Sequence, residues 1–301
     1  MWRLETERGT FAVKEMATEW PPARVERAFV LERAAFEAGI PMPAAVVNPA
    51  TGGCIGEIAR PDGVRANVRV HAWVEGEGLR RIVYGTEYAG RVAGVIARIH
   101  ALDITGGETI AEALAVGGDE HWSALAEEVE RSAAEWRWEL RGLLPVVHDL
   151  EMYIESAHGD PTPLIMGHRD ADQKNWMKTP GGELLPVDWD AAGPVHPRHE
   201  VANLALTWAG VHLGEPDWKV VRAWIAAYRE AGGELQRIET GDLAEFVIVT
   251  LGWFEYNARR AIGASDDAER KAASDLVRRG FKDLPRVLRS IERWERALGE
   301  E

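Results

Sequence analysis

The sequence predicts an α+β protein with two lobes, a small β-rich N-terminal lobe and a large, mostly helical C-terminal lobe. Apolar and polar residues alternate in several stretches of the first 75 positions, which is the period of a β-strand. Apolar residues at helical spacing dominate the remainder of the chain. A Gly-containing connector at residues 75–78 marks the change. The predicted lobes are therefore residues 1–75 and 76–301.

The N-terminal lobe is predicted to begin with a β-hairpin. Residues 2–6 and 10–16 both alternate, and the turn-like Glu7-Arg8-Gly9 separates them. A helix then runs from Pro21-Pro22 to about Ala38, because proline is tolerated in the first helical turn and Gly39 ends the pattern. Three further strands are predicted, at residues 44–47, 56–58 and 68–74.

The C-terminal lobe is predicted to be helical around one central hairpin. Residues 178–189, KTPGGELLPVDW, place a Pro-Gly-Gly turn between two extended segments. Apolar residues recur at helical spacing on either side of this hairpin. The predicted helices are residues 84–100, 121–140, 150–156, 200–209, 218–231, 243–262, 268–279 and 285–298.

Composition excludes several classes of protein. No apolar run approaches the roughly 18 residues that a membrane span needs, and the charged N-terminus lacks the apolar core of a secretory signal. The single cysteine, Cys54, cannot form an internal disulfide and fits a reducing cytoplasm. The net charge of −14 argues against a nucleic-acid partner and is compatible with a cationic small substrate.

Lysine is scarce, with six lysines against 29 arginines, and Lys14 is the only one in residues 1–173. A lysine kept in such a chain indicates a position that needs a compact ammonium group. Lys14 lies in the predicted strand FAVKE, ahead of a helix that carries Glu26 and Glu32. A strand lysine of this kind can reach an ATP phosphate tail, and a helix glutamate can orient it. Its alternative is a solvated strand lysine.

A second group of polar residues follows the apolar run at residues 164–166. The stretch GHRDADQKNW contains Asp170 and Asn175, and PVDWD supplies Asp188 and Asp190 further on. A carboxylate can accept the proton of a hydroxyl nucleophile, and carboxylate and amide oxygens are ligands that Mg²⁺ prefers. The alternative is a set of turn-forming and capping residues.

Taken in order, the motifs FAVKE, HRDADQKN and PVDWD resemble those of the kinase-like phosphotransferases, and specifically the aminoglycoside phosphotransferase family. The resemblance covers roughly residues 2–210 and implies a two-lobed protein-kinase-like fold. It implies that Asp170 is the catalytic base, that Asn175 and Asp188 bind Mg²⁺, and that Asp190 supports the metal site. It also implies that Lys14 binds ATP, with Glu26 preferred as its partner and Glu32 as the alternative. The adenine edge would meet the carbonyl of Ala72 and the amide of Val74.

The sequence departs from the family pattern in two places. Arg169 replaces a usual glycine, and Asp172 stands where a histidine is frequent. Asp172 is expected either to bind a cationic acceptor or to raise the pKa of Asp170. A Gly-rich phosphate-covering hairpin is expected before Trp2, and Gly9 cannot replace it because it lies in the following turn. Either the start lies upstream or the phosphates are poorly covered.

Several other residues have two possible roles. His168 is expected to pack and to hydrogen-bond backbone rather than to act in catalysis. In HPRHE, His196, His199 and Glu200 resemble metal ligands without a second partner at useful spacing. Glu255 and Tyr256, in the helical stretch WFEYNARR, are candidates for an acceptor pocket, and an amphipathic core helix explains them as well.

The predicted activity is transfer of the γ-phosphoryl group of ATP, with Mg²⁺, to a hydroxyl of a small molecule, with an aminoglycoside-like, cationic acceptor favoured. One alternative is a kinase of the same fold acting on a choline-like, sugar or amino-alcohol acceptor. The other is a nucleotide-binding protein with impaired catalysis. The oligomeric state is left open.

Overall fold

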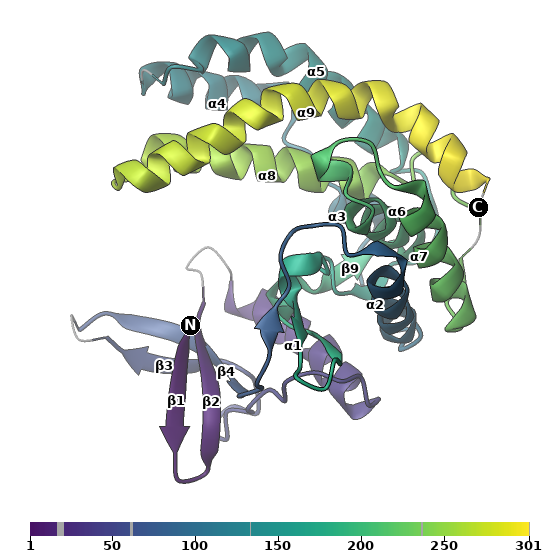
Figure 1. Cartoon of the computed structure of the whole chain (residues 1–301). Coiled ribbons are helices and arrows are strands. Elements are labelled where there is room, and N and C mark those ends of the chain that lie inside the picture. Colours follow the sequence, from purple (N-terminus) through teal and green to yellow (C-terminus); the bar gives the residue numbers. More distant parts are fainter. Residues whose placement is uncertain (17–20, 61–62, 133, 236, 301) are drawn as a thin grey trace. The chain divides into compact units, whose positions relative to one another are not determined.

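The computed structural model describes residues 1–16, 21–60, 63–132, 134–235 and 237–300, and it confirms the predicted α+β class (Figure 1). The chain divides into two compact units. Unit 1 comprises Met1–Gly107, Ile165–Val195 and Leu204–Glu234, and unit 2 comprises Glu108–Leu164, His196–Asn203 and Leu235–Glu301. No helix in the described ranges is long and apolar enough to cross a membrane. The lobe boundary after residue 75 remains a prediction.

Unit 1 contains an antiparallel four-stranded sheet with the order β1-β2-β4-β3 (Figure 1). The predicted N-terminal hairpin is confirmed, and Lys14 on β2 lies directly opposite Arg69 on β4. Because side chains directly opposite in a sheet share one face, Lys14 and Arg69 are neighbours. The strand predicted at residues 44–47 is only one bridge, between Ala45 and His71. The strands are β1 (Trp2–Thr6), β2 (Gly9–Glu15), β3 (Gly56–Ala59) and β4 (Arg65–Ala72).

Helix α1 (Pro22–Glu37) begins with proline and is followed by Gly39 in a left-handed conformation, as the sequence predicts. Its buried residues Val25 and Phe29 form a core cluster with Met16 and Cys54. This apolar contact fixes α1 beside the sheet. The same helix also buries Glu32, whose side chain is 1% exposed. A carboxylate buried to this extent requires a charged or hydrogen-bonding partner.

Short strands elsewhere in unit 1 frame two loops. The polar loop (residues 168–175) connects β6 (Ile165–Gly167) to β7 (Trp176–Lys178). The acidic loop (residues 188–190) follows β8 (Leu184–Pro186). Strands β7 and β8 form the predicted hairpin, and β6 pairs with β9 (Gly193–Val195). Strand β5 (Glu77–Gly78) extends the β7–β8 hairpin, and helices α2 (Gly85–His100) and α7 (Trp218–Glu230) pack against each other.

Unit 2 is helical, with two differences from the predicted boundaries. The predicted helix 121–140 is divided between α4 (Gly118–Arg131) and α5 (Arg137–Ser156), and α5 includes the predicted helix 150–156. The helices predicted at 268–279 and 285–298 form one helix, α9 (Asp267–Gly299), with Pro285 inside it. Apolar packing on both sides of Pro285, by Leu284 and Val287, outweighs the hydrogen bond that proline removes. Unit 2 also contains α3 (Ile110–Ala113) and α8 (Ala244–Gly263), and α6 (Pro197–Trp208) begins there and ends in unit 1.

Candidate active site

The polar loop is held in place from its buried side. The indole N–H groups of Trp176 and Trp208 both donate to the carbonyl of Ala171, at 3.1 and 3.0 Å. Both indoles are fully buried, as is Ala171. Gln173, in the short 3-10 helix η1 (Gln173–Asn175), donates to the carbonyl of Thr207 at 3.1 Å. A loop anchored in this way can hold its exposed side chains in fixed positions.

Asp170 lies near the start of this loop with a partly exposed carboxylate. Lys174 Nζ donates to both of its oxygens, at 3.0 Å to Oδ1 and 2.9 Å to Oδ2. Burial raises the pKa of Asp170, while Lys174 lowers it and Asp172 raises it. The net shift is upward, so Asp170 binds a proton more strongly than an ordinary aspartate does.

Asp172 is already engaged by neighbouring cations. Its Oδ2 accepts from Arg81 at 2.8 Å and lies 3.4 Å from Lys174 Nζ, and its Oδ1 accepts the backbone N–H of Lys174. The carboxylate therefore caps η1. The expectation that Asp172 raises the pKa of Asp170 is confirmed in direction. Its alternative role, binding a cationic acceptor, remains a prediction.

Asn175 and His168 are both buried beside Asp170. Asn175 Nδ2 donates to the backbone carbonyl of Asp170 at 2.6 Å, and Asn175 is 3% exposed. His168 is fully buried and packs against Trp189, with ring centroids 4.6 Å apart. Within the described ranges neither ring nitrogen of His168 has a hydrogen-bond partner. Its packing role is confirmed, and its expected hydrogen bond to backbone is not found.

The acidic loop begins with an unusual backbone conformation. Asp188 has φ 62° and ψ 63°, in the left-handed region. Among the described non-glycine residues only Asp103, Arg169 and Asp188 have positive φ. Arg169 lies in the polar loop and Asp188 in the acidic loop. Such conformations cost energy and concentrate at functional sites. The Val187 N–H donates to the Asn175 carbonyl at 2.9 Å, which brings the two loops together.

Lys14 joins both acids of the acidic loop. Its Nζ donates to Asp188 Oδ1 at 2.5 Å and to Asp190 Oδ2 at 2.7 Å. Burial alone would lower the pKa of Lys14, but Asp188 and Asp190 raise it overall. Burial would raise the pKa of Asp190, but Lys14 and Arg69 lower it overall. These charges are therefore maintained at neutral pH.

The expected pairing of Lys14 with Glu26 is not present in the structure. The Glu26 carboxylate instead accepts the backbone N–H groups of Cys54 and Ile55, at 3.2 and 3.4 Å. A Cβ at Gly53 would lie 2.3 Å from Glu26 Oε1, so a larger residue there would displace the Glu26 carboxylate from this position. Glu26 therefore fastens α1 to the segment that precedes β3.

Glu32, the alternative partner, does not contact Lys14 either. It pairs with Arg69 Nη2, and its Oε1 lies 2.8 Å from His71 Nε2. Arg69 Nη1 also donates to Asp190 Oδ1 at 2.5 Å. Glu32, the glutamate of helix α1, therefore pairs with Arg69 and not with Lys14. Strand alternation in VRVHAWV, which places Arg69 and His71 on one face, was the signal that could have found this.

The predicted adenine contacts lie at the end of β4. Ala72 is its last residue and pairs with Phe11 on β2, and its N–H donates to the carbonyl of Ala44 at 2.7 Å. Val74 follows in a segment without regular structure. The Ala72 N–H is therefore used within the protein, and the predicted contact concerns its carbonyl. The role of both residues remains a prediction.

Glu255 and Tyr256 lie on α8 in unit 2. One oxygen of Glu255 is 2.9 Å from both His121 Nε2 and Arg259 Nε. Tyr256 is 51% exposed and stacks on Trp253, which is 43% exposed, with ring centroids 5.6 Å apart. The Arg260 guanidinium lies over the Tyr256 ring, 5.8 Å from its centroid. The role of Glu255 and Tyr256 in acceptor binding remains a prediction.

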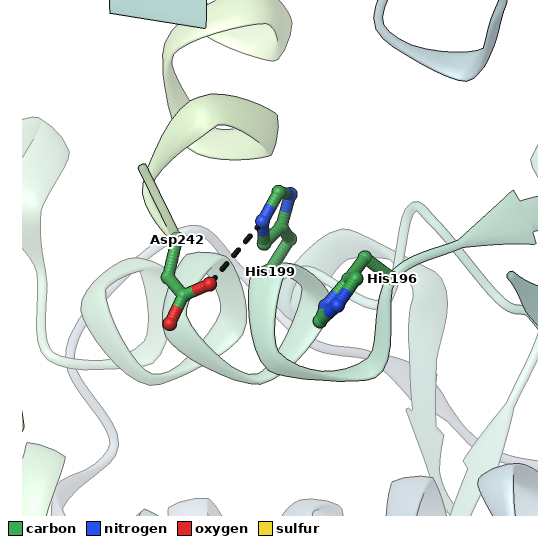
Figure 2. A group of neighbouring side chains, drawn as sticks. All are labelled: His196, His199 and Asp242. Atoms are coloured by element: carbon green, nitrogen blue, oxygen red, sulfur yellow. Dashed lines mark ion pairs between the residues drawn. The ribbon is translucent and has the colours of Figure 1, made fainter. Parts of the chain in front are cut away.

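A possible metal-binding group also occurs in unit 2. His196, His199 and Asp242 are buried, and their ligand atoms lie within 4.8 Å of one another (Figure 2). His199 Nε2 is 3.3 Å from Asp242 Oδ1. Asp242 lies 43 positions beyond His199, which explains why the sequence alone shows no partner. Glu200, the last residue of the HPRHE motif, is fully buried.

Arg198 already forms hydrogen bonds with two of these three residues, Asp242 and His196. Its Nε donates to Asp242 at 3.1 Å, and its Nη2 donates to Asp160 at 2.7 Å. The Arg198 backbone N–H donates to His196 Nδ1, so the neutral ring carries its proton on Nε2, 3.5 Å from Asp160. Burial lowers the pKa of His196 to about 4, which keeps the ring neutral. The group is therefore an ion-pair network organised by Arg198.

A model of the phosphotransferase enzyme family matches residues 1–246. No curated protein matches the chain significantly.

Several solved structures share the fold. An aminoglycoside phosphotransferase from Alicyclobacillus acidocaldarius is 14% identical, with a TM-score of 0.55, and the match covers 99% of this chain and 93% of that one. A spectinomycin phosphotransferase in complex with ADP and spectinomycin is 10% identical, with a TM-score of 0.67 and coverage of 98% and 89%. An ethanolamine kinase from Plasmodium vivax is 14% identical, with a TM-score of 0.60 and coverage of 94% and 77%.

Proposed function

The chain belongs to the phosphotransferase enzyme family. We propose that it is a small-molecule kinase that transfers the γ-phosphoryl group of ATP, with Mg²⁺, to a hydroxyl of a small cationic molecule. The observation that carries this proposal is the convergence of Lys14, Asp188 and the Asp170–Asn175 loop in one compact unit. The spectinomycin phosphotransferase was solved with ADP, which supports the nucleotide part.

Asp170 and Lys14 have separate roles in this proposal. Asp170 accepts the proton of the acceptor hydroxyl, for which its partly exposed carboxylate and raised pKa suit it. Lys14 binds the phosphate tail of ATP, and Asp188 and Asp190 hold its ammonium group in position before the nucleotide enters. The hydroxyl oxygen forms the new bond to phosphorus, the bond to the bridging oxygen breaks, and ADP leaves.

The donor set of the two loops fits Mg²⁺. Asn175 and Asp188 offer amide and carboxylate oxygens, which are ligands that this cation prefers. The Asp188 side chain is 39% exposed, whereas both oxygens of Asp190 are used by Lys14 and Arg69. Asp188 and Asn175 would therefore hold the metal, and Asp190 would support it indirectly. Bound Mg²⁺ would neutralise negative charge on the phosphate oxygens.

The cationic acceptor is supported by charge, since the net charge of −14 favours a positively charged ligand. Glu255 and Tyr256 on α8 are the proposed acceptor residues, and each already has an arginine beside it: Arg259 pairs with Glu255 at 2.9 Å, and the Arg260 guanidinium lies 5.8 Å from the Tyr256 ring centroid. The similar structures named for ethanolamine and spectinomycin support a small-molecule acceptor. Choline-like, amino-alcohol and sugar acceptors are the alternatives within the same reaction.

A coupled ADP-release assay with Mg·ATP and a panel of hydroxyl acceptors tests the proposal. The panel contains aminoglycosides, choline, ethanolamine and a neutral sugar. Asp170→Asn should lower kcat by about 10²–10⁴-fold, the usual contribution of a general base. Asp188→Asn should abolish turnover that depends on Mg·ATP, because the metal loses its carboxylate. If the wild-type protein binds Mg·ATP but releases no ADP in a reaction that depends on Asp170, the chain is instead a nucleotide-binding protein without catalysis.

A further inference from the structure

Arg69 is the most deeply buried cation beside the proposed active site. It lies on β4 opposite Lys14, on the same face of the sheet, and is 1% exposed. A guanidinium buried to this degree needs charged partners to offset the loss of hydration. Both of its partners are carboxylates, Glu32 on α1 and Asp190 in the acidic loop.

The two carboxylates belong to elements that the proposed reaction requires in a fixed arrangement. Arg69 Nη2 pairs with Glu32, and Arg69 Nη1 donates to Asp190 Oδ1 at 2.5 Å. The other oxygen of Asp190 accepts from Lys14 at 2.7 Å. A continuous chain of charged contacts therefore runs from α1 through Arg69 and Asp190 to Lys14, which also contacts Asp188.

This chain differs from a direct link between the strand lysine and a helix glutamate. Because Glu32 pairs with Arg69, Lys14 forms its ion pairs with the acidic loop, through Asp188 and Asp190. The planar guanidinium can bridge two carboxylates through separate nitrogens, whereas a lysine is a single point of charge. Arg69 thus supplies a geometry that a lysine at the same position would not reproduce.

We propose that Arg69 is a positioning residue, which uses Glu32 and Asp190 to hold α1, Lys14 and the metal-binding Asp188 in one arrangement. This proposal rests on the proposed function. Arg69 is 1% exposed, and its two charged contacts are to Glu32 and Asp190. It acts on Mg·ATP binding through Asp190, so its loss changes the Mg²⁺ requirement rather than the acceptor affinity.

Two variants test the charged contacts Glu32–Arg69–Asp190. Arg69→Lys changes the central guanidinium, and Glu32→Gln removes the carboxylate on α1. Groups that orient metal ligands typically contribute 10–100-fold to metal affinity or activity, so each variant should raise the half-saturating Mg²⁺ concentration by roughly 10-fold or more. The acceptor KM should stay at the wild-type value. The measurements are calorimetric ATP binding over a series of Mg²⁺ concentrations, steady-state kinetics and the thermal midpoint of each variant.

Arg198→Lys is the matched control, because Arg198 also bridges two carboxylates, Asp160 and Asp242, in unit 2. It should lower the thermal midpoint and leave the Mg²⁺ requirement of ATP binding unchanged. Arg69 would be a purely structural residue if Arg69→Lys shifted the Mg²⁺ requirement no more than Arg198→Lys does. If Arg69→Lys raises the half-saturating Mg²⁺ concentration and Glu32→Gln does not, the contact of Arg69 with α1 plays no part in Mg·ATP binding. Wild-type protein that binds ATP with Mg²⁺ but turns over no acceptor would overturn the proposed function, while calorimetry would still decide the role of Arg69.

Discussion

Asp170 lies among charged side chains of both signs, and their balance sets the pH at which it can accept a proton. Burial and Asp172 raise its pKa, and Lys174 lowers it. Because a general base works only when deprotonated, the rate should fall as the pH drops through this raised pKa. The acid limb of activity is therefore expected above the ordinary aspartate pKa.

Lys174→Met removes the contribution that lowers the pKa of Asp170. The pKa of Asp170 should then rise further, and the acid limb of kcat/KM should move to higher pH. Lys174→Arg retains the positive charge and should shift the limb less. Profiles of kcat/KM against pH at saturating Mg·ATP measure the effect. An acid limb that stays in place in Lys174→Met would mean that another group controls it.

The sequence selected individual candidate residues, but it did not give the pairing of their side chains. Asp170, Asn175 and Asp188 could be selected from motif order, because the residue types needed for phosphoryl transfer are few. The partner of Lys14 could not, since helix register and the competition from Arg69 are tertiary properties. Lys174 was visible in the motif, but its contact with Asp170 depends on how the loop turns through η1.

At the scale of elements, hydrophobic periodicity located most helices and gave the ends of α2, α7 and α8 to within one residue, but it misplaced ends of α4, α5 and α9. The sequence pattern predicts a helix start at Pro285, but α9 continues through it because buried residues on either side keep the helix packed. The break between α4 and α5 lies inside a pattern that appeared continuous in sequence. Both differences have the same cause, since packing against other helices determines where a helix ends.

The anchoring of the polar loop gives a prediction for Trp176 and Trp208. Both donate to the Ala171 carbonyl, so either single change to Phe leaves one donor and should cost about 1 kcal/mol of unfolding free energy. The double variant leaves that buried carbonyl without a partner, and its cost should exceed the sum of the single costs. Chemical denaturation of the four proteins measures this. Strict additivity would show that water or another group replaces the indoles.

On the scale of the whole molecule, the Arg198 network should make unit 2 sensitive to acid. The pKa of His196 falls from 6.5 to about 4 in the folded chain because the ring is buried. A depressed histidine pKa means that the unfolded chain binds the proton first. The contribution of the neutral His196 ring to the free energy of unfolding is therefore complete above pH 6.5. It is lost progressively towards pH 4, by at most about 3 kcal/mol.

His196→Gln isolates this effect. Glu295 acts in the opposite direction, since burial raises its pKa and protonation relieves a penalty. Asp160 and Asp242 have lowered pKa values, so their contribution is lost only at still lower pH. The difference in unfolding free energy between wild type and His196→Gln, measured from pH 7 to pH 4, should therefore narrow as the pH falls. A constant difference would contradict the assignment to His196.

The net charge of the whole chain gives a prediction about the acceptor. A field produced by a net charge of −14 should concentrate cations near the protein and raise their association rate. Salt screens such a field, since the Debye length falls from about 10 Å at 0.1 M to about 3 Å at 1 M. With Mg·ATP saturating, kcat/KM for a cationic acceptor should fall several-fold as NaCl rises over this range, whereas a neutral sugar acceptor should change little. Initial rates at each salt concentration provide the comparison, and equal salt dependence for the two acceptors would show that charge does not select the substrate.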